Sequence, residues 1–211
     1  MTSLPVIIIG VNPFALEVAS IFQKNEVVIY GFLDDDPKKK DTQIGEIPVL
    51  GSTEDESYWG LIGKNCGVFV ALENPTERKK MIETIMEDRQ VKPVNAIHPS
   101  AIIADVKNLA YGVYVGAGAI IQPEAKLADH CMVGAGVIVE TGAQIEEYVQ
   151  IGAGSVIGKE CKLDTNCFIG IQSTLVGSIK IGKGATVGAG SVVIEPVPAS
   201  KRVFGNPAKL L

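Results

Sequence analysis

The chain has 211 residues, with 19 lysine and arginine against 24 aspartate and glutamate side chains, so its formal net charge is −5. This length fits two domains. The excess of acidic residues argues against a nucleic-acid partner, because phosphates bind to a basic protein surface. The longest early apolar run, Val6–Ile9, is too short to span a membrane and follows no basic segment, so we expect neither a membrane partner nor a targeting segment.

The first hundred residues alternate short apolar runs with helical patterns. Strands are predicted over residues 5–10, 26–33, 47–50, 68–72 and 94–97. Helices are predicted after Asn12-Pro13 and Asn74-Pro75, because each pair joins a favoured N-cap residue to a proline suited to the first helical position. Thr53 and Glu56 are predicted to cap a further short helix. This alternation predicts an α/β, Rossmann-like domain over residues 1–98.

The second half carries a repeat of six residues. From Ile103 to Val193 every sixth residue is aliphatic without a break, a small residue often stands two positions earlier, and glycine often follows directly. A period of six is typical of a hexapeptide parallel β-helix, in which three hexapeptides form one coil. We therefore predict an all-β domain over residues 99–211 with the aliphatic column inside. The glycines are expected to relieve positive φ at the corners.

The cysteines and histidines restrict the chemistry. Cys66, Cys131, Cys161 and Cys167 show no metal-ligand spacing, and three of them fall in the small-residue column. We expect reduced, structural cysteines in a cytoplasmic protein without a metal site.

Several motifs occur in unbroken order along nearly the whole chain, namely Ile-Ile-Ile-Gly at 7–10, Gly-Phe-Leu-Asp-Asp-Asp-Pro at 31–37, Ile-Pro-Val-Leu-Gly-Ser at 47–52, His-Pro-Ser-Ala at 98–101 and Gly-Asn-Pro-Ala-Lys at 205–209. With the repeat, they resemble the left-handed β-helix acyltransferases. The branch is that of sialic acid O-acetyltransferases and of N-acetyltransferases for nucleotide-linked 4-amino sugars. The resemblance implies a homotrimer, a nucleotide sugar in the N-terminal domain, and acetyl-CoA as co-substrate between neighbouring β-helices.

The resemblance also points to catalytic positions. The family's catalytic histidine follows an Asn-Thr-Gly-Ala stretch by four residues, and the matching stretch here is Glu140–Ala143. The histidine position is then Glu147, the acidic partner falls at Tyr148, and a second family histidine falls at Val156. Glu147 is the first candidate base, and His130, almost one coil beneath, is the second. A solvated corner charge and an exposed corner residue are the alternative interpretations of these two.

The first domain departs from the family at its glycine-rich turn. That turn keeps one glycine of the phosphate cradle, and its proline offers no N–H group. The resemblance implies that five residues bind the substrate. Three of them have an alternative structural role, which is a solvated turn for the two aspartates and a helix cap for Asn74. The set is Gly10, Asn12, Asp34, Asp35 and Asn74.

For the cofactor, the resemblance implies contacts from the backbone of Ile171 and Ala189 and from Lys201 and Arg202, although a solvated tail would explain the last two equally well. The predicted function is acetyl-CoA-dependent acyl transfer to an amino sugar, expected to be nucleotide-linked, for surface glycan synthesis. Losing the histidine favours an amine acceptor, since an alcohol depends more on deprotonation. The alternatives are a catalytically silent homologue that binds a sugar nucleotide or CoA, and an O-acetyltransferase of a sugar acid.

Overall fold

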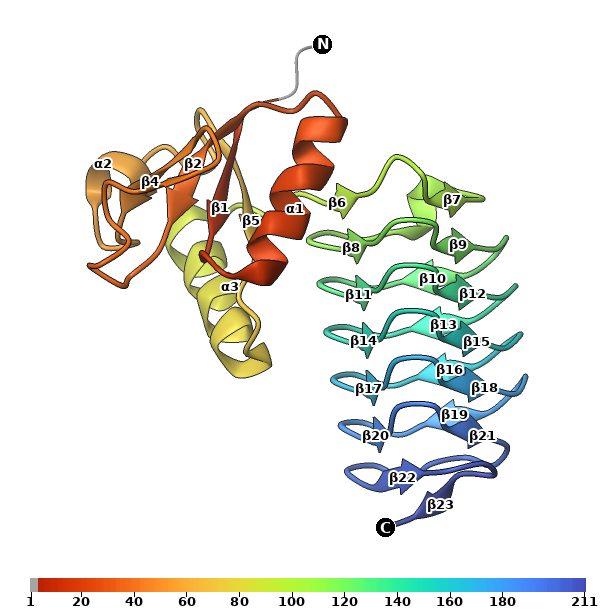
Figure 1. The fold of residues 1–211 in the computed structure, drawn as a ribbon. Helices are drawn as coiled ribbons and strands as arrows, with labels where there is room; N and C mark the ends of the chain where they lie inside the picture. The colour runs from red at the N-terminus through yellow and green to blue at the C-terminus, as the bar shows by residue number, and fades with distance from the viewer. Residues whose placement is uncertain (1–3) are drawn as a thin grey trace. The chain divides into compact units, whose positions relative to one another are not determined.

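The computed structural model describes residues 4–211 (Figure 1). Its internal contacts separate the chain into two compact units, of which the first ends at Ala96 and the second begins at Ile97. Within the described residues, no helix is both long enough and apolar enough to cross a bilayer.

The first unit is a five-stranded sheet with helices. Its strands lie in the order β3-β4-β2-β1-β5, and all pairs are parallel except β3 with β4. The central strand β1 is buried along its whole length, as its four consecutive aliphatic residues predict. The elements are β1 (Val6–Ile9), α1 (Pro13–Lys24), β2 (Ile29–Leu33), β3 (Gln43–Ile44), β4 (Ile47–Gly51), α2 (Glu56–Trp59), β5 (Gly67–Val70) and α3 (Pro75–Arg89).

Helices α1 and α3 begin at the predicted asparagines, but α2 does not begin as expected. Asp55 is the N-cap of α2, and its carboxylate accepts a hydrogen bond from the N–H of Ser57 at 3.0 Å. Thr53 instead directs its hydroxyl to Asp35 at 2.9 Å. The prediction that Thr53 caps this helix was therefore wrong, because a carboxylate two residues later takes that place.

The strand predicted over 94–97 is shorter and belongs elsewhere. Val94 donates one backbone hydrogen bond to Val68 at 2.9 Å, after Pro93, which has no N–H to donate. The chain then forms β6 (Ala96–Ile97), which neighbours β8 in a sheet of the β-helix rather than extending the first sheet.

The second unit is a left-handed parallel β-helix whose strands stack with a register of eighteen residues, for example Gln150 on Met132 and Phe168 on Gln150 (Figure 1). It has three faces, which we name by their outward residues. The apolar face holds β7 (Ile102–Ile103), β9 (Ile120–Ile121), β12 (Ile138–Val139), β15 (Val156–Ile157), β18 (Thr174–Leu175) and β21 (Val192–Val193). The lysine face holds β10 (Lys126–Leu127), β13 (Gln144–Ile145), β16 (Lys162–Leu163) and β19 (Lys180–Ile181). The mixed face holds β6, β8 (Tyr114–Val115), β11 (Met132–Val133), β14 (Gln150–Ile151), β17 (Phe168–Ile169), β20 (Thr186–Val187), β22 (Arg202–Phe204) and the antiparallel β23 (Lys209–Leu210). A 3-10 turn, η1 (Val106–Asn108), lies in the first coil.

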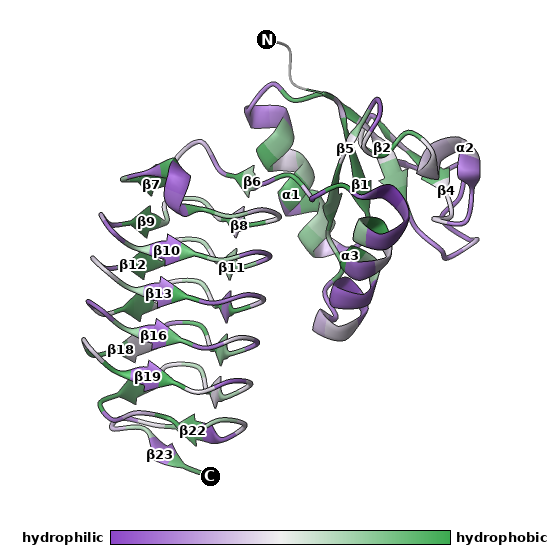
Figure 2. Cartoon of the chain, turned by 180° about the vertical axis from the view of Figure 1, so that it is seen from behind, coloured by the Kyte–Doolittle hydropathy of each residue, from purple (hydrophilic) through white to green (hydrophobic). Residues whose placement is uncertain are grey.

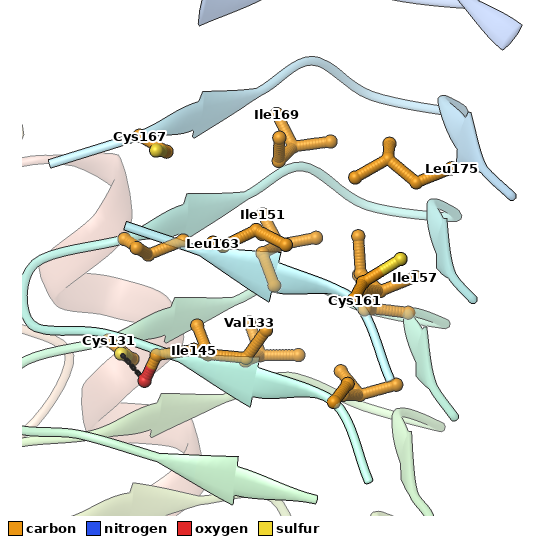
Figure 3. Close-up of a cluster of buried hydrophobic side chains, with 14 of the residues drawn as sticks. Cys131, Val133, Ile145, Ile151, Ile157, Cys161, Leu163, Cys167, Ile169 and Leu175 are labelled. Atoms are coloured by element: carbon orange, nitrogen blue, oxygen red, sulfur yellow. Dashed lines mark hydrogen bonds between the residues drawn. The ribbon is translucent and has the colours of Figure 1, made fainter. Parts of the chain in front are cut away.

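The aliphatic column forms the core of the β-helix, as the period of six predicts (Figure 3). Every member is buried except Ile103, which is half-buried in the first coil and still packs against the same core. The outward residues alternate with this column, so each strand from β9 to β21 has one side chain in the core and one nearer the surface, whereas both residues of β8 are buried.

The small-residue column is also inward and carries donors. The Ser155 hydroxyl donates to the Gly170 carbonyl at 2.9 Å, and the Cys161 thiol donates to the Val176 carbonyl at 3.0 Å. Burial raises the pKa of the Cys131 thiol to about 12 and that of Cys167 to about 11. These cysteines are free and buried, so they pack and hydrogen-bond rather than react.

The glycines that directly follow the aliphatic column have a different role from the one expected. Gly134 does not have positive φ; Gly136, two residues later, does, at 66°. A Cβ added to Gly134 would lie 2.7 Å from the backbone nitrogen of Ala153 in the next coil. The predicted relief of positive φ was therefore wrong, because these positions need glycine for the close approach of stacked corners.

Candidate functional site

The first unit contains a cavity of about 350 Å³ at the carboxyl ends of β1, β2 and β5, where open parallel sheets commonly bind ligands. Helix α3 contributes one side of it. The lining residues are Ile9, Gly10, Leu33, Asp34, Asp35, Asp36, Thr53, Leu72, Glu77, Lys80, Met81 and Thr84.

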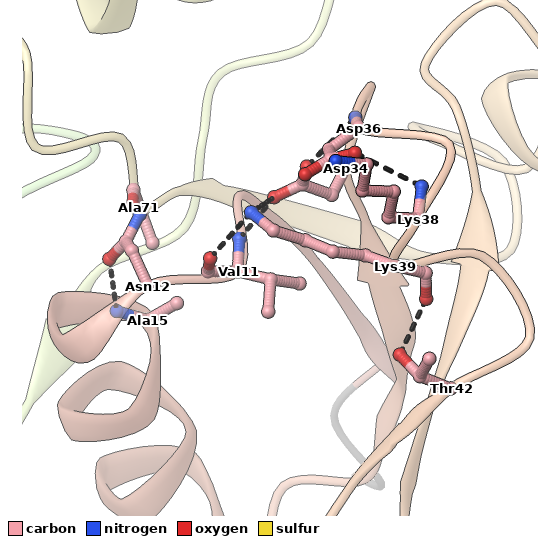
Figure 4. Close-up of polar contacts among 9 residues, drawn as sticks. All are labelled: Val11, Asn12, Ala15, Asp34, Asp36, Lys38, Lys39, Thr42 and Ala71. Carbon is pink, nitrogen blue, oxygen red and sulfur yellow. Dashed lines mark hydrogen bonds and ion pairs between the residues drawn. The ribbon is translucent and has the colours of Figure 1, made fainter.

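The turn between β1 and α1 places Gly10 in the cavity lining, and Figure 4 shows the polar contacts of this turn. Gly10 has φ of 104°, and an added Cβ would lie 3.0 Å from the Ala71 carbonyl oxygen, so this position requires glycine. Asp34 fastens the turn, because its Oδ2 accepts hydrogen bonds from the Val11 N–H at 2.8 Å and from the Lys39 Nζ at 2.9 Å. Lys39 also donates to the Val11 carbonyl at 2.9 Å.

The two predicted asparagines act at helix ends and do not line the cavity. The Asn12 side chain accepts from the Ala15 N–H at 2.9 Å and donates to the Ala71 carbonyl at 2.7 Å, so it caps α1 and ties it to the end of β5. Asn74 accepts from the N–H groups of Thr76 at 2.9 Å and Glu77 at 3.3 Å. Asn74 therefore acts as the N-cap of α3, as the alternative interpretation of this residue predicted.

Asp35 lines the cavity and is held by the loop after β4. Its Oδ1 accepts hydrogen bonds from the Ser52 hydroxyl at 2.8 Å and from the Thr53 N–H at 2.8 Å. Burial acts to raise the pKa of Asp35, but the hydrogen bonds from Thr53 and Ser52 outweigh it and hold the pKa below its usual value. The carboxylate is therefore fixed in place and ionised at neutral pH.

The contribution of α3 to the cavity was not predicted from the sequence. Glu77, Lys80, Met81 and Thr84 line the cavity. The spacing of three, four and seven residues places these side chains on one helical face, which is the signal that was available. Met86 is exposed, because the buried face of α3 centres on Ile82 and Ile85.

In the second unit, Glu147 lies exposed at the corner between the lysine and mixed faces, here called the Glu147 corner. His130 lies in the same corner, one coil earlier, and is only 5% exposed. The Tyr148 ring covers it, with ring centroids 4.9 Å apart and planes inclined by 31°. The expectation of an exposed corner residue was wrong for His130, because the chain turns at φ of 62° there and 58° at Tyr148, which stacks the two rings.

Two of the predicted cofactor positions, Ile171 and Ala189, lie at the corner between the mixed and apolar faces, here called the Ile171 corner. The Ile171 side chain is 57% exposed, and its carbonyl accepts a hydrogen bond from the Gly190 N–H at 2.8 Å, so Ala189 stacks directly on it in the next coil. Lys201 and Arg202 are exposed, and Arg202 is in register with Thr186 on the mixed face.

The two corners lie on different edges of one β-helix. Six residues separate Glu147 from Ala153, which belongs to the Ile171 corner, so they are at most about 20 Å apart along the mixed face. Within one chain the two corners are therefore at opposite ends of a mixed-face strand. Among residues 4–211, no three histidine, cysteine, aspartate or glutamate side chains are grouped to hold a metal ion.

Known families match both units. The family described as PglD N-terminal domain matches residues 5–85, bacterial transferase hexapeptide repeats match residues 124–159, and hexapeptide repeats of succinyl-transferase match residues 162–195. Among curated protein sequences, none gives a significant match.

Solved structures of similar architecture cover the whole chain. A variant of GDP-perosamine N-acetyltransferase from Caulobacter crescentus, in complex with CoA and GDP-perosamine, is 27% identical over 99% of both chains with a TM-score of 0.88. The acetyltransferase domain of PglB from Neisseria gonorrhoeae is 22% identical over 99% of this chain and 100% of its own, with a TM-score of 0.70. WeeI from Acinetobacter baumannii is 23% identical over the same shares with a TM-score of 0.68, and these last two similarities concern the fold alone.

Proposed function

We propose that the chain is a left-handed β-helix acetyltransferase with a PglD-type N-terminal domain, and that it transfers an acetyl group from acetyl-CoA to an amino sugar. The observation that carries the proposal is the match over 99% of both chains to an N-acetyltransferase held in complex with CoA and an amino sugar nucleotide. In this chain the unbroken β-helix and the cavity of the first unit are the regions proposed to hold CoA and the sugar nucleotide.

The reaction joins the amine nitrogen to the acetyl carbonyl carbon and breaks the thioester carbon–sulfur bond. The proton leaves the nitrogen, and the CoA sulfur departs and ends as a thiol. Glu147 is the proposed proton acceptor, because its carboxylate is exposed at the family's histidine position. His130 is the weaker candidate, since Tyr148 covers its ring.

An amine is the proposed nucleophile rather than a hydroxyl. A carboxylate is a weaker base than an imidazole, and an alcohol gains most from deprotonation, whereas an unprotonated amine already has a lone pair to donate. We therefore expect amide rather than ester products.

The acceptor is proposed to be linked to a nucleotide. The perosamine relative holds a GDP-linked sugar. In this chain the cavity has an apolar floor that includes Leu33 and Leu72, and carboxylates from Asp35 and Asp36 that can accept the N–H and O–H donors of a nucleoside.

A homotrimer packed through the β-helices is the proposed assembly, and the apolar face supports it. Its outward residues are mainly aliphatic, in contrast to the charged lysine face (Figure 2). Ile102 is 64% exposed on it in the single chain. The outward residues of the apolar face are Ile102, Ile120, Ile138, Val156, Thr174 and Val192. The Ile171 corner borders the apolar face, so packing through that face would bring this corner against a neighbouring copy.

A thiol-release assay with acetyl-CoA over a panel of free and nucleotide-linked amino sugars tests the proposal. Release that depends on the amino sugar supports an acetyltransferase. If none of the acceptors in the panel stimulates thiol release, the proposal is contradicted and the catalytically silent homologue is favoured. The silent homologue is the second candidate because Glu147 and Val156 stand at the positions of the two family histidines.

Mixed trimers test whether the site joins two chains. Chains with Glu147→Gln and chains with Ala189→Trp are each expected to be impaired alone. After co-refolding in equal amounts, about one quarter of the sites would combine an intact Glu147 with an intact neighbouring Ala189. Recovered activity supports a shared site, and no recovery contradicts it.

A further inference from the structure

The β1–α1 turn uses its own backbone donors within the protein. The Val11 N–H donates to the Asp34 carboxylate at 2.8 Å, and the Ala15 N–H donates to Asn12 at 2.9 Å. Pro13 has no N–H. A phosphate at a helix N-terminus depends on such donors, so these three positions have none to offer it.

The start of α3 is closed in the same way. Pro75 lacks an N–H, and the N–H groups of Thr76 and Glu77 donate to the Asn74 side chain at 2.9 and 3.3 Å. Both helix starts are therefore capped by an asparagine followed by a proline. In addition, Glu77 places a carboxylate in the cavity lining, which repels an anion.

The remaining lining residues leave one group suited to a diphosphate. Asp34, Asp35 and Asp36 supply carboxylates along one side, and Lys80 on α3 is the sole cation among the lining residues. The Thr84 hydroxyl, one turn further along, donates to the Lys80 carbonyl at 3.0 Å, so it serves the helix rather than the cavity.

We propose that the Lys80 ammonium, and not the β1–α1 turn, holds the diphosphate of the nucleotide-linked acceptor. The inference rests on the proposed function. The cavity is then polarised, with the nucleoside donors toward Asp35 and Asp36 and the phosphates toward Lys80. A lysine acts as a point charge on phosphate and needs no backbone cradle, which fits a turn that keeps only Gly10 of the glycine-rich cradle.

Calorimetry on the full chain tests this with a ligand cycle. GDP, UDP and CDP are titrated first, and the tightest binder is compared with its own nucleoside. The ratio of the two dissociation constants measures what the diphosphate contributes. In Lys80→Met we expect this ratio to fall about tenfold, as for a lost charged hydrogen bond at a partly exposed site, with the nucleoside constant changed less than twofold.

Lys79→Met is the matched control, because Lys79 neighbours Lys80 on the same helix, lies outside the cavity lining and pairs with Glu83 at 3.9 Å. Its ratio is expected to equal that of the wild type. An unchanged ratio in Lys80→Met, or an equal fall in Lys79→Met, would overturn the inference.

Failure of the proposed function gives a different result. If no nucleotide binds to the wild type, both this inference and the nucleotide link of the acceptor are wrong, while thiol release with free amino sugars would still support acetyl transfer. If nucleotides bind with a diphosphate contribution that is independent of Lys80, only this inference fails.

Discussion

Two glycines of one corner meet different requirements of the β-helix, which are the close approach of stacked coils at Gly134 and a positive φ at Gly136. We predict that their alanine variants differ in stability. Gly134 follows the aliphatic column directly, and an added Cβ would lie 2.7 Å from the Ala153 nitrogen and 3.0 Å from the Ile151 carbonyl oxygen. Gly136 has φ of 66°, and nothing lies within 4 Å of its added Cβ.

The expected magnitudes follow from these distances. Favourable non-bonded separations are about 3.5–4.0 Å, so the Gly134→Ala methyl overlaps backbone atoms that no side-chain rotation can move away. We expect a loss of about 2–3 kcal/mol in the free energy of unfolding, at the upper part of the overpacking range. Gly136→Ala places a side chain on a left-handed backbone without a clash, so we expect a loss of about 1 kcal/mol in the free energy of unfolding.

Urea unfolding followed by circular dichroism, at one fixed protein concentration, measures both variants against the wild type. The concentration is fixed because self-association would otherwise shift the midpoint. Equal losses in the two variants, or a larger loss for Gly136→Ala, would refute the close-approach argument for the glycines after the aliphatic column.

Three further predictions concern the core, the first unit and the assembly. Native thiols are expected to resist a thiol reagent up to about pH 9 and to react after unfolding, because burial raises the pKa of Cys131 to about 12 and that of Cys167 to about 11; rapid native labelling of either one would contradict their inward placement. Asp35→Asn is expected to lose less of its free energy of unfolding than the wild type when the pH falls below about 4. Hydrogen bonds hold the pKa of Asp35 below its unfolded value, so its stabilisation is present above that value and is lost as pH falls through the folded pKa. Equal losses between pH 7 and pH 3 in variant and wild type would count against this expectation. Light scattering is expected to give three times the 22.3 kDa chain mass, falling for Ile138→Lys on the apolar face but not for Lys162→Ala on the lysine face; dissociation by the second variant alone would place the interface elsewhere.

The β-helix was predictable because its signal is periodic and its packing is local. Each aliphatic residue from Leu109 to Leu175 pairs with the column residue eighteen positions later in the next coil, so one rule applies from coil to coil. What each glycine does was not predictable, because the sequence does not distinguish a close backbone approach at Gly134 from the positive φ of Gly136.

The candidate site was predictable only in part. Gly10, Asp34 and Asp35 follow strand ends that meet at one edge of a sheet, and the structure places all three in the cavity lining. Lys80 escaped notice because its place in the lining depends on how α3 packs. The burial of His130 depends on corner dihedrals that stack it beneath Tyr148, which residue spacing does not reveal.

The central claim, acetyl transfer to an amine with Glu147 as base, is tested most directly by mass spectrometry of the acceptor after incubation with acetyl-CoA. The account predicts a product heavier by one acetyl group, resistant to mild alkali as an amide is, and formed faster as pH rises toward the pKa of the acceptor amine. Glu147→Gln is expected to form it more slowly by about tenfold or more, at or below the lower end of general-base effects, with a smaller effect for His130→Ala. An alkali-labile ester, or equal rates for the wild type and Glu147→Gln, would contradict the account.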